Sequence, residues 1–193
     1  MKKEKLLKFI YLFFIISCVV VFYYYIYDGT EYMVSTIDGK SYKVQDGPDM
    51  QIRVDSLAIL NDKLNTIVNN LKNSNSNSYA VQKLIKNWDR GVTIKEIGKM
   101  ETDAAYVINK QYMSFCLRDI NNNMNLLTYV GIHELSHIMS DEIGHGKEFV
   151  KNFEFLLNYA KTLKYQGEPL YIPLNQTKTP DNYCGVSLEN SIS

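Results

Sequence analysis

All three histidines of this chain lie within a stretch of thirteen residues, and this clustering constrains its fold and chemistry more than any other feature. Residues 133–137 read His-Glu-Leu-Ser-His, and the third histidine is His145. In a helix, residues i and i+4 lie one above the other on the same face, so His133 and His137 can bind one metal ion from consecutive turns. Glu134 is turned by about 100° around the helix and can reach a water beside the metal. Three nitrogen ligands and one open position are typical of a catalytic zinc site.

The same pattern also arises by chance in helices whose histidines are ordinary surface or core residues. Two observations favour a metal site. The preceding residues 126–132 are apolar enough for a buried helix, in which unrelated histidines are uncommon. The chain also contains no other histidine. We therefore predict one zinc ion per chain, bound by His133, His137 and His145.

A long uncharged run follows a lysine-rich N-terminus. As a helix, residues 9–27 would span about 28 Å, close to the thickness of the bilayer hydrocarbon. Tyrosines gather at the far end of the run, as in an interfacial aromatic belt. We expect residues 1–8 to be a basic cytoplasmic N-terminus and residues 9–27 a single-pass transmembrane anchor. The rest of the chain would lie on the opposite face of a viral or host membrane.

Three alternatives to this anchor remain open. A cleaved signal peptide usually has a shorter apolar stretch and ends at small residues, which are missing here. Cys18 follows residues that faintly resemble a lipoprotein cleavage site, although very apolar residues come after it. A buried core helix would not explain the tyrosines at one end.

Charge gives no reason to expect a nucleic-acid partner. The chain has 21 basic and 21 acidic residues, of which four lysines and one glutamate lie in residues 1–27. The remainder therefore has 17 basic and 20 acidic residues, a net charge of −3. A mildly acidic domain has no electrostatic attraction for a phosphate backbone. We expect a protein or peptide substrate, and a lipid bilayer bound through residues 9–27.

The remaining sequence predicts an α+β domain over residues 49–193, preceded by a hairpin or linker over residues 28–48. Apolar periodicity and turn residues predict these elements: strands over 32–37 and 40–44, helices over 50–72 and 79–88, strands over 105–108 and 111–117, helices over 124–140 and 147–164, and a short strand over 183–188. The sheet is expected to be small and antiparallel. A strand just before the histidine helix could hold a substrate as an added β-strand.

The residues around the histidines resemble the WLM and SprT-like metallopeptidases. Those families continue from His-Glu-Leu-x-His through a turn of varying length to a histidine and then an aromatic residue, here His145 and Phe149. Metzincins place the third ligand six residues after the second histidine, where this chain has Ile143. Thermolysin-like enzymes use a glutamate on the next helix, for which Glu148 and Glu154 are candidates. We prefer His145, with Glu148 as a reserve ligand or a partner of the ligands.

Residues 115–118 and 183–186 also look like segments of WLM-type peptidases of large DNA viruses. The resemblance implies a zincin-like domain with an active-site helix, preceded here by the transmembrane helix. Characterised WLM and SprT relatives cut proteins crosslinked to DNA, a substrate that the anchor and the acidic domain do not favour.

The predicted function is therefore a membrane-anchored, zinc-dependent endopeptidase. Glu134 would be its general base and would pass the proton to the leaving amine. Tyr171 and Tyr183 are candidates for stabilising the oxyanion, and Arg118 for orienting the substrate. One alternative is a catalytically silent binding module stabilised by zinc, although a structural site has no use for Glu134. The other is a structural membrane or virion protein without metal.

Two features would fit an exported domain. Cys116 and Cys184 could form one disulfide, although the sequence alone does not place them within bonding distance. Residues 175–177 form a glycosylation sequon at Asn175.

Overall fold

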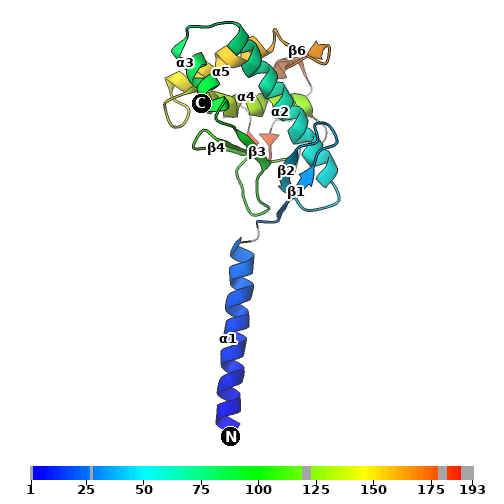
Figure 1. The fold of residues 1–193 in the computed structure, drawn as a ribbon, viewed down its shortest axis with the longest axis vertical. Helices are drawn as coiled ribbons and strands as arrows, with labels where there is room; N and C mark the ends of the chain where they lie inside the picture. The colour runs from blue at the N-terminus through cyan, green and yellow to red at the C-terminus, as the bar shows by residue number, and fades with distance from the viewer. Residues whose placement is uncertain (1, 27, 119–122, 178–181, 188–193) are drawn as a thin grey trace.

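The chain forms an α+β structure in which helices pack on a small sheet (Figure 1). The computed structural model describes residues 2–26, 28–118, 123–177 and 182–187. The helices are α1 (Lys2–Ile26), α2 (Met50–Asn73), α3 (Tyr79–Trp88), α4 (Met124–Met139), α5 (Lys147–Ala160) and the short 3-10 helix η1 (Leu174–Gln176). The strands are β1 (Thr30–Val34), β2 (Ser41–Gln45), β3 (Thr93–Glu96), β4 (Ala105–Ile108), β5 (Tyr112–Phe115), β6 (Lys164–Tyr165), β7 (Glu168–Pro169), β8 (Asn182–Tyr183) and β9 (Val186–Ser187).

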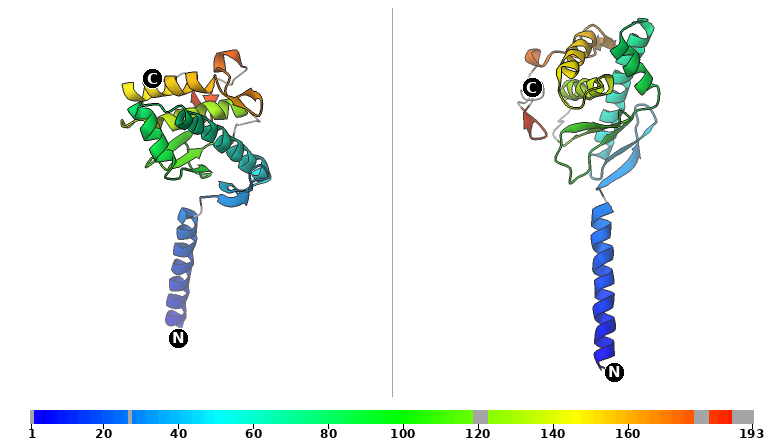
Figure 2. Two further views of the ribbon diagram at one scale, coloured as in Figure 1. Left: turned by 45° about the horizontal axis from the view of Figure 1, so that its top comes forward. Right: turned by 90° about the vertical axis from the view of Figure 1, so that its left-hand side faces the viewer.

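Helix α4 lies at the centre of the fold, where it contacts α2, α3, α5 and β4 (Figure 2). Its closest approach to α2 is at Gly131, where a Cβ atom would lie 2.6 Å from the Leu60 Cδ1 atom. Glycine lowers helix propensity by about 1 kcal/mol relative to alanine. At this position its missing side chain is what allows the two helices to pack closely.

Helix α2 shows why apolar periodicity predicts this part of the fold well. Its inward face carries a buried stripe at helical spacing: Val54, Leu57, Leu60, Leu64, Ile67, Val68 and Leu71. The predicted helices over 50–72, 79–88 and 124–140 are confirmed to within one residue at each end. The helix predicted over 147–164 ends earlier, at Ala160, because a turn and strand β6 follow it.

The central sheet is mixed, so the expectation of an antiparallel sheet was wrong. Strand β5 lies in the middle, antiparallel to β4 and parallel to β3, in the order β3-β5-β4. The sequence predicted β4 and β5 but not β3, whose partner is far along the chain. Strands β1 and β2 form a separate antiparallel hairpin, paired from Thr30 with Gln45 to Val34 with Ser41. They are shifted by one to three residues from the predicted strands.

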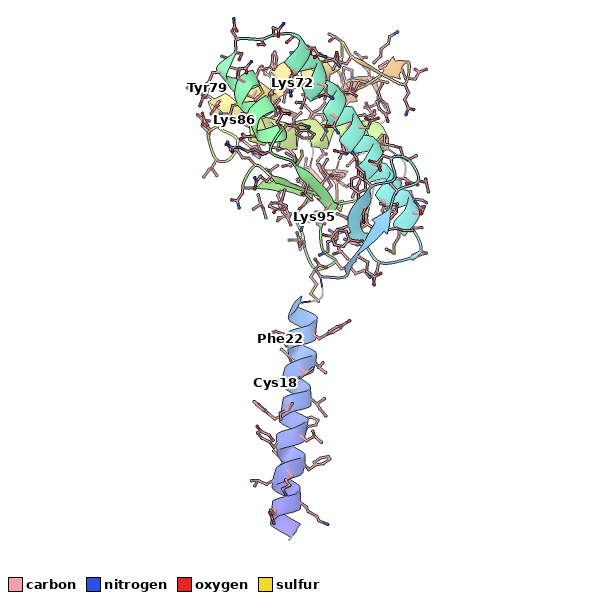
Figure 3. The ribbon with its side chains drawn as sticks, in the orientation of Figure 1. Cys18, Phe22, Lys72, Tyr79, Lys86 and Lys95 are labelled. Atoms are coloured by element: carbon pink, nitrogen blue, oxygen red, sulfur yellow. A yellow bond between two sulfur atoms is a disulfide. The ribbon has the colours of Figure 1, made fainter. Side chains whose placement is uncertain are left out.

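Helix α1 corrects the prediction of a membrane anchor. Figures 1 and 3 show it standing apart from the rest of the chain, with Cys18 and Phe22 projecting from it. Among the described residues, no helix combines the length and apolar character that a bilayer crossing requires. The predicted span over residues 9–27 and the single-pass placement derived from it were therefore wrong. The prediction relied on the absence of charge over residues 9–27, of which Tyr27 lies outside the described residues.

The C-terminal part of the chain lies on the domain as two short hairpins. Strands β6 and β7 pair across residues 166–167, and β8 and β9 pair across residues 184–185. The second hairpin is linked to the end of β5 by a disulfide between Cys116 and Cys184, whose Cα atoms are 6.4 Å apart. The strand predicted over 183–188 is thus a tight hairpin, and Leu188 lies outside the described residues.

Candidate metal centre

Helix α4 places His133 and His137 on one face, one turn apart. The helix starts where the Asn123 side chain accepts a hydrogen bond from the Leu126 N–H, 3.0 Å away. This is the usual contact of an N-cap residue with the third residue of a helix. The helix ends at Met139, and both histidine rings are partly buried.

His145 reaches the same point from the loop between α4 and α5. Its Nε2 atom is 3.0 Å from the Nε2 atom of His133. One nitrogen from each of the three rings lies within 4.8 Å of the others. Nitrogens that are each about 2 Å from one zinc ion are roughly 3–4 Å apart. Small rotations of the rings would therefore bring all three nitrogens within bonding distance of one zinc ion.

Phe149, the first large apolar residue of α5, supports all three rings from behind. Its ring centroid lies 4.8 Å from that of His133, 4.3 Å from that of His137 and 4.7 Å from that of His145. The Phe149 side chain is fully buried. The sequence placed it in the core, and the structure adds that it limits the rotation of all three imidazoles.

Burial keeps the two helical imidazoles neutral. It lowers the pKa of His133 to about 3, with further contributions from His137 and His145. Burial also lowers the pKa of His137 to about 4, with smaller contributions from His145 and Lys110. A neutral imidazole offers a lone pair, which is the form that binds a metal.

Glu134 is the unusual carboxyl of the site. It is 3% exposed, and among the described residues its Oε2 atom has no hydrogen-bond partner. Burial raises its pKa to about 8. A buried carboxyl without a partner is unfavourable unless a cation or a water satisfies it. Three imidazoles beside such a carboxyl form a donor set that fits zinc with an open position for a water.

A network of polar contacts holds the loop that carries His145. The Glu148 carboxylate accepts hydrogen bonds from the backbone N–H groups of Asp141 and Glu142, at 2.9 and 3.1 Å. The Glu142 carboxylate in turn accepts one from the Glu148 N–H, at 3.3 Å. Lys83 of α3 pairs with both Asp141 and Glu148, at 2.8 and 3.3 Å.

Neither of the two glutamates that the sequence offered as alternative ligands belongs to the histidine group. Glu148 is occupied with the loop backbone and is not grouped with the histidines. Glu154 is exposed on α5 and is not part of the group either. Glu148 lies in the first turn of α5, but the N–H groups that it binds belong to the preceding loop and not to the helix.

The histidines lie between two cavities. A cavity of about 620 Å³ runs along β4 and includes His133, Glu134, His137 and His145 in its lining. A smaller one of about 270 Å³ shares His133, Glu134 and His145 and is also lined by Tyr183. The candidate site is therefore open to a ligand on both sides.

The other predicted site residues are placed as follows. Tyr183 lines the smaller cavity, and its hydroxyl donates a hydrogen bond to the Cys116 carbonyl. Tyr171 is 5% exposed and lines neither cavity. Its ring centroid lies 6.3 Å from that of Tyr129. Arg118 donates a hydrogen bond to the Glu101 carbonyl, 3.1 Å away.

Comparison with known proteins places this geometry in context. A family model described as "YgjP-like, metallopeptidase domain" matches residues 21–166. The chain is similar to uncharacterized protein R325 of Acanthamoeba polyphaga mimivirus, with 26% identity over 170 residues that cover 83% of each chain. No solved structure matches the chain.

Two shorter similarities are to proteins of invertebrate iridescent viruses. Uncharacterized protein 136R of Invertebrate iridescent virus 6 is 32% identical over 74 residues, which are 35% of this chain and 42% of that protein. Uncharacterized protein 042R of Invertebrate iridescent virus 3 is 34% identical over 65 residues, which are 32% of this chain and 41% of that protein.

Proposed function

The chain belongs to the YgjP-like metallopeptidase family, and on that premise we propose that it is an endopeptidase in which His133, His137 and His145 bind zinc and Glu134 is the general base. As a family member it is a zinc-dependent hydrolase with one zinc ion per chain. The resemblance to SprT- and WLM-like peptidases and to viral proteins is confirmed. The observation that carries the proposal is the buried Glu134 carboxyl beside three converging imidazoles.

The residues of the site would divide the work as follows. When bound, zinc supplies a Lewis acid that polarises the substrate carbonyl and lowers the pKa of water. Glu134 takes the proton of the attacking water and delivers it to the leaving amine. Phe149 keeps the imidazoles oriented and excludes water behind them.

Strand β4 supports cleavage within a polypeptide. It is the edge strand of the central sheet, and its residues 105–108 line the larger cavity together with the histidines. An edge strand can bind an extended peptide through backbone hydrogen bonds. A peptide bound along β4 would continue past the metal on both sides, as an endopeptidase requires.

The test combines zinc stoichiometry with cleavage of an unfolded protein by the full chain. We expect one zinc ion per chain in the wild type and in Glu134→Gln, and a loss of about 10²- to 10⁴-fold in cleavage rate for Glu134→Gln. Glu154→Gln, an exposed acidic position on α5, is the matched control and should keep both properties.

Three outcomes would contradict the proposal in different ways. Cleavage by Glu134→Gln at the wild-type rate would remove Glu134 as the base. Zinc without any cleavage by the wild type would favour the silent binding module. A chain that holds no zinc would overturn the assignment of the three histidine ligands.

A further inference from the structure

The C-terminal hairpin β8–β9 forms one wall of the smaller cavity at the candidate metal centre. Tyr183 and Val186 contribute to the lining, together with His133, Glu134 and His145. The family match ends at residue 166, so this wall comes from a part of the chain beyond the matched domain. The hairpin thus adds a surface to a site whose chemistry is complete without it.

The hairpin is fixed at the end of β5 by three attachments. The disulfide joins Cys184 to Cys116, and the Tyr183 hydroxyl donates a hydrogen bond to the Cys116 carbonyl. The Tyr183 side chain is 2% exposed and packs in the core. Two-residue strands alone would not hold a hairpin in place. These attachments give it a fixed position relative to the histidines.

The turn of the hairpin directs the disulfide inward. Cys184 and Gly185 are its two central residues, with φ angles of 50° and 84°. Positive φ at both positions is the type I′ geometry that matches the twist of paired strands. Cys184 therefore lies in the turn at the tip of the hairpin. Val186 begins the second strand, β9, and is 43% exposed.

The lining of the smaller cavity indicates what it can accept. Facing the hairpin are Ala104 and Ala105 at the start of β4, and Val130 of α4 forms another side. Together with Val186 they form an aliphatic part of the wall, and the exposed Thr102 and Asp103 line the same cavity. The volume of about 270 Å³ is at the low end for ligand pockets, which suits a single side chain.

We propose that the β8–β9 hairpin, fixed by the Cys116–Cys184 disulfide, selects substrates with an apolar side chain next to the bond that is cut. This inference rests on the proposed function, because the smaller cavity shares His133 and Glu134 with the groove along β4. A peptide bound along β4 that crosses the metal places one neighbouring side chain against Val186. A carboxylate there would lose its hydration beside Asp103 without gaining a partner.

The test uses the full chain and peptides that differ only in the residues flanking the cut bond, carrying Ala, Leu, Asp or Lys. We expect the wild type to prefer Leu over Asp by at least about 10-fold in kcat/KM, the scale at which one pocket discriminates, and to prefer Leu over Lys by less, because Asp103 also lines the cavity. Val186→Trp should fill the cavity and shift the preference from Leu to Ala. Val186→Asp should shift it toward Lys. Val34→Trp, at another exposed valine in β1, is the matched control and should keep the wild-type profile.

Breaking the disulfide tests the attachment itself. Cys184→Ser should reduce the preference for Leu over Asp while zinc stays at one per chain, because the metal ligands do not depend on the hairpin. An unchanged peptide profile in both Val186→Trp and Cys184→Ser would overturn the proposal.

A binding measurement separates this proposal from the proposed function. The same peptides are titrated into Glu134→Gln, which should hold zinc without cutting. Preferential binding of the Leu peptide, lost in the double variant with Val186→Trp, supports the hairpin even if the wild type cuts no peptide. Equal binding of all peptides overturns it, whatever the cleavage assay shows.

Discussion

The three histidines of the candidate metal centre are held in two different ways. His133 and His137 come from α4, which is enclosed by α2, α3, α5 and β4. His145 comes from an exposed loop that is held by hydrogen bonds and ion pairs from Glu148 and Lys83. Packing is insensitive to salt, whereas exposed ion pairs are screened by it. The positions of His133 and His137 should therefore change little with salt. The position of His145 should change with salt and with substitutions in the polar network.

The largest expected effect is the loss of a helical ligand. His137→Ala removes a half-enclosed nitrogen that water cannot easily replace, so zinc affinity should fall by more than about 100-fold, beyond what outer contacts of a metal site are worth. His145→Ala should lose less, because water can occupy its exposed position. Titration against a competing chelator measures both, with the exposed Asn158→Ala as control. Equal losses in the two histidine variants would break the comparison.

The second effect tests the packing of α4 directly. Gly131→Val adds a side chain where a Cβ atom would already be 2.6 Å from Leu60 Cδ1. Overpacking of this kind costs about 1–3 kcal/mol in the free energy of unfolding. Denaturant unfolding of the metal-free chain measures it. The loss caused by Gly131→Val should be smaller in a Leu60→Ala background, and equal losses in both backgrounds would show that the two residues do not compete for space.

The difference between regular helical packing and contacts made by other segments also explains which parts of the fold could be predicted from the sequence. The helices with a regular apolar stripe were placed closely, because burial on one face imposes the spacing. Strand β3 was missed because its pairing with β5, from Thr93 with Tyr112 onward, depends on a contact between distant segments. The pairing of Cys116 with Cys184, 68 residues apart, is non-local for the same reason. The anchor predicted over residues 9–27 was wrong, because no helix of the described residues meets the requirements of a bilayer crossing.

The same distinction between local spacing and contacts of distant segments applies to the candidate site. The convergence of His133 and His137 follows from helical spacing alone, and a short turn brings His145 near them. The local sequence could not show that Phe149 contacts all three rings or that Lys83 bridges the loop to α3, because both depend on how helices pack. The contacts of Glu148 with the N–H groups of Asp141 and Glu142 depend on the conformation of the loop, which the local sequence does not show.

The third effect concerns the polar network of the loop. Glu148→Gln weakens the hydrogen bonds to the N–H groups of Asp141 and Glu142 and removes the charge opposite Lys83. Loss of an outer contact of this kind typically lowers metal affinity by about 10- to 100-fold. The exposed Glu154→Gln is the matched control. Salt should lower the zinc affinity of the wild type more than that of Glu148→Gln, and identical zinc affinities for the two glutamate variants would show that the loop needs no polar support.

The smallest effect comes from a polar contact far from the metal, where the same chemistry should change stability but not zinc affinity. The Asp55 carboxylate of α2 accepts hydrogen bonds from the Ser35 hydroxyl and the Thr36 N–H, at 2.7 and 2.8 Å. Burial raises the pKa of Asp55, but hydrogen bonds from Ser35, Gln51 and Thr36 outweigh it and leave the pKa below the usual value of 3.8. The stability that this carboxylate contributes is therefore present above the unfolded pKa and is lost as the pH falls through the folded one.

Asp55→Asn should lower the free energy of unfolding by about 1 kcal/mol at neutral pH, and by progressively less below pH 3.8. Unfolding curves measured over that range check the sign, and a change in zinc affinity in this variant would mean that the β1–β2 hairpin and the metal centre are coupled.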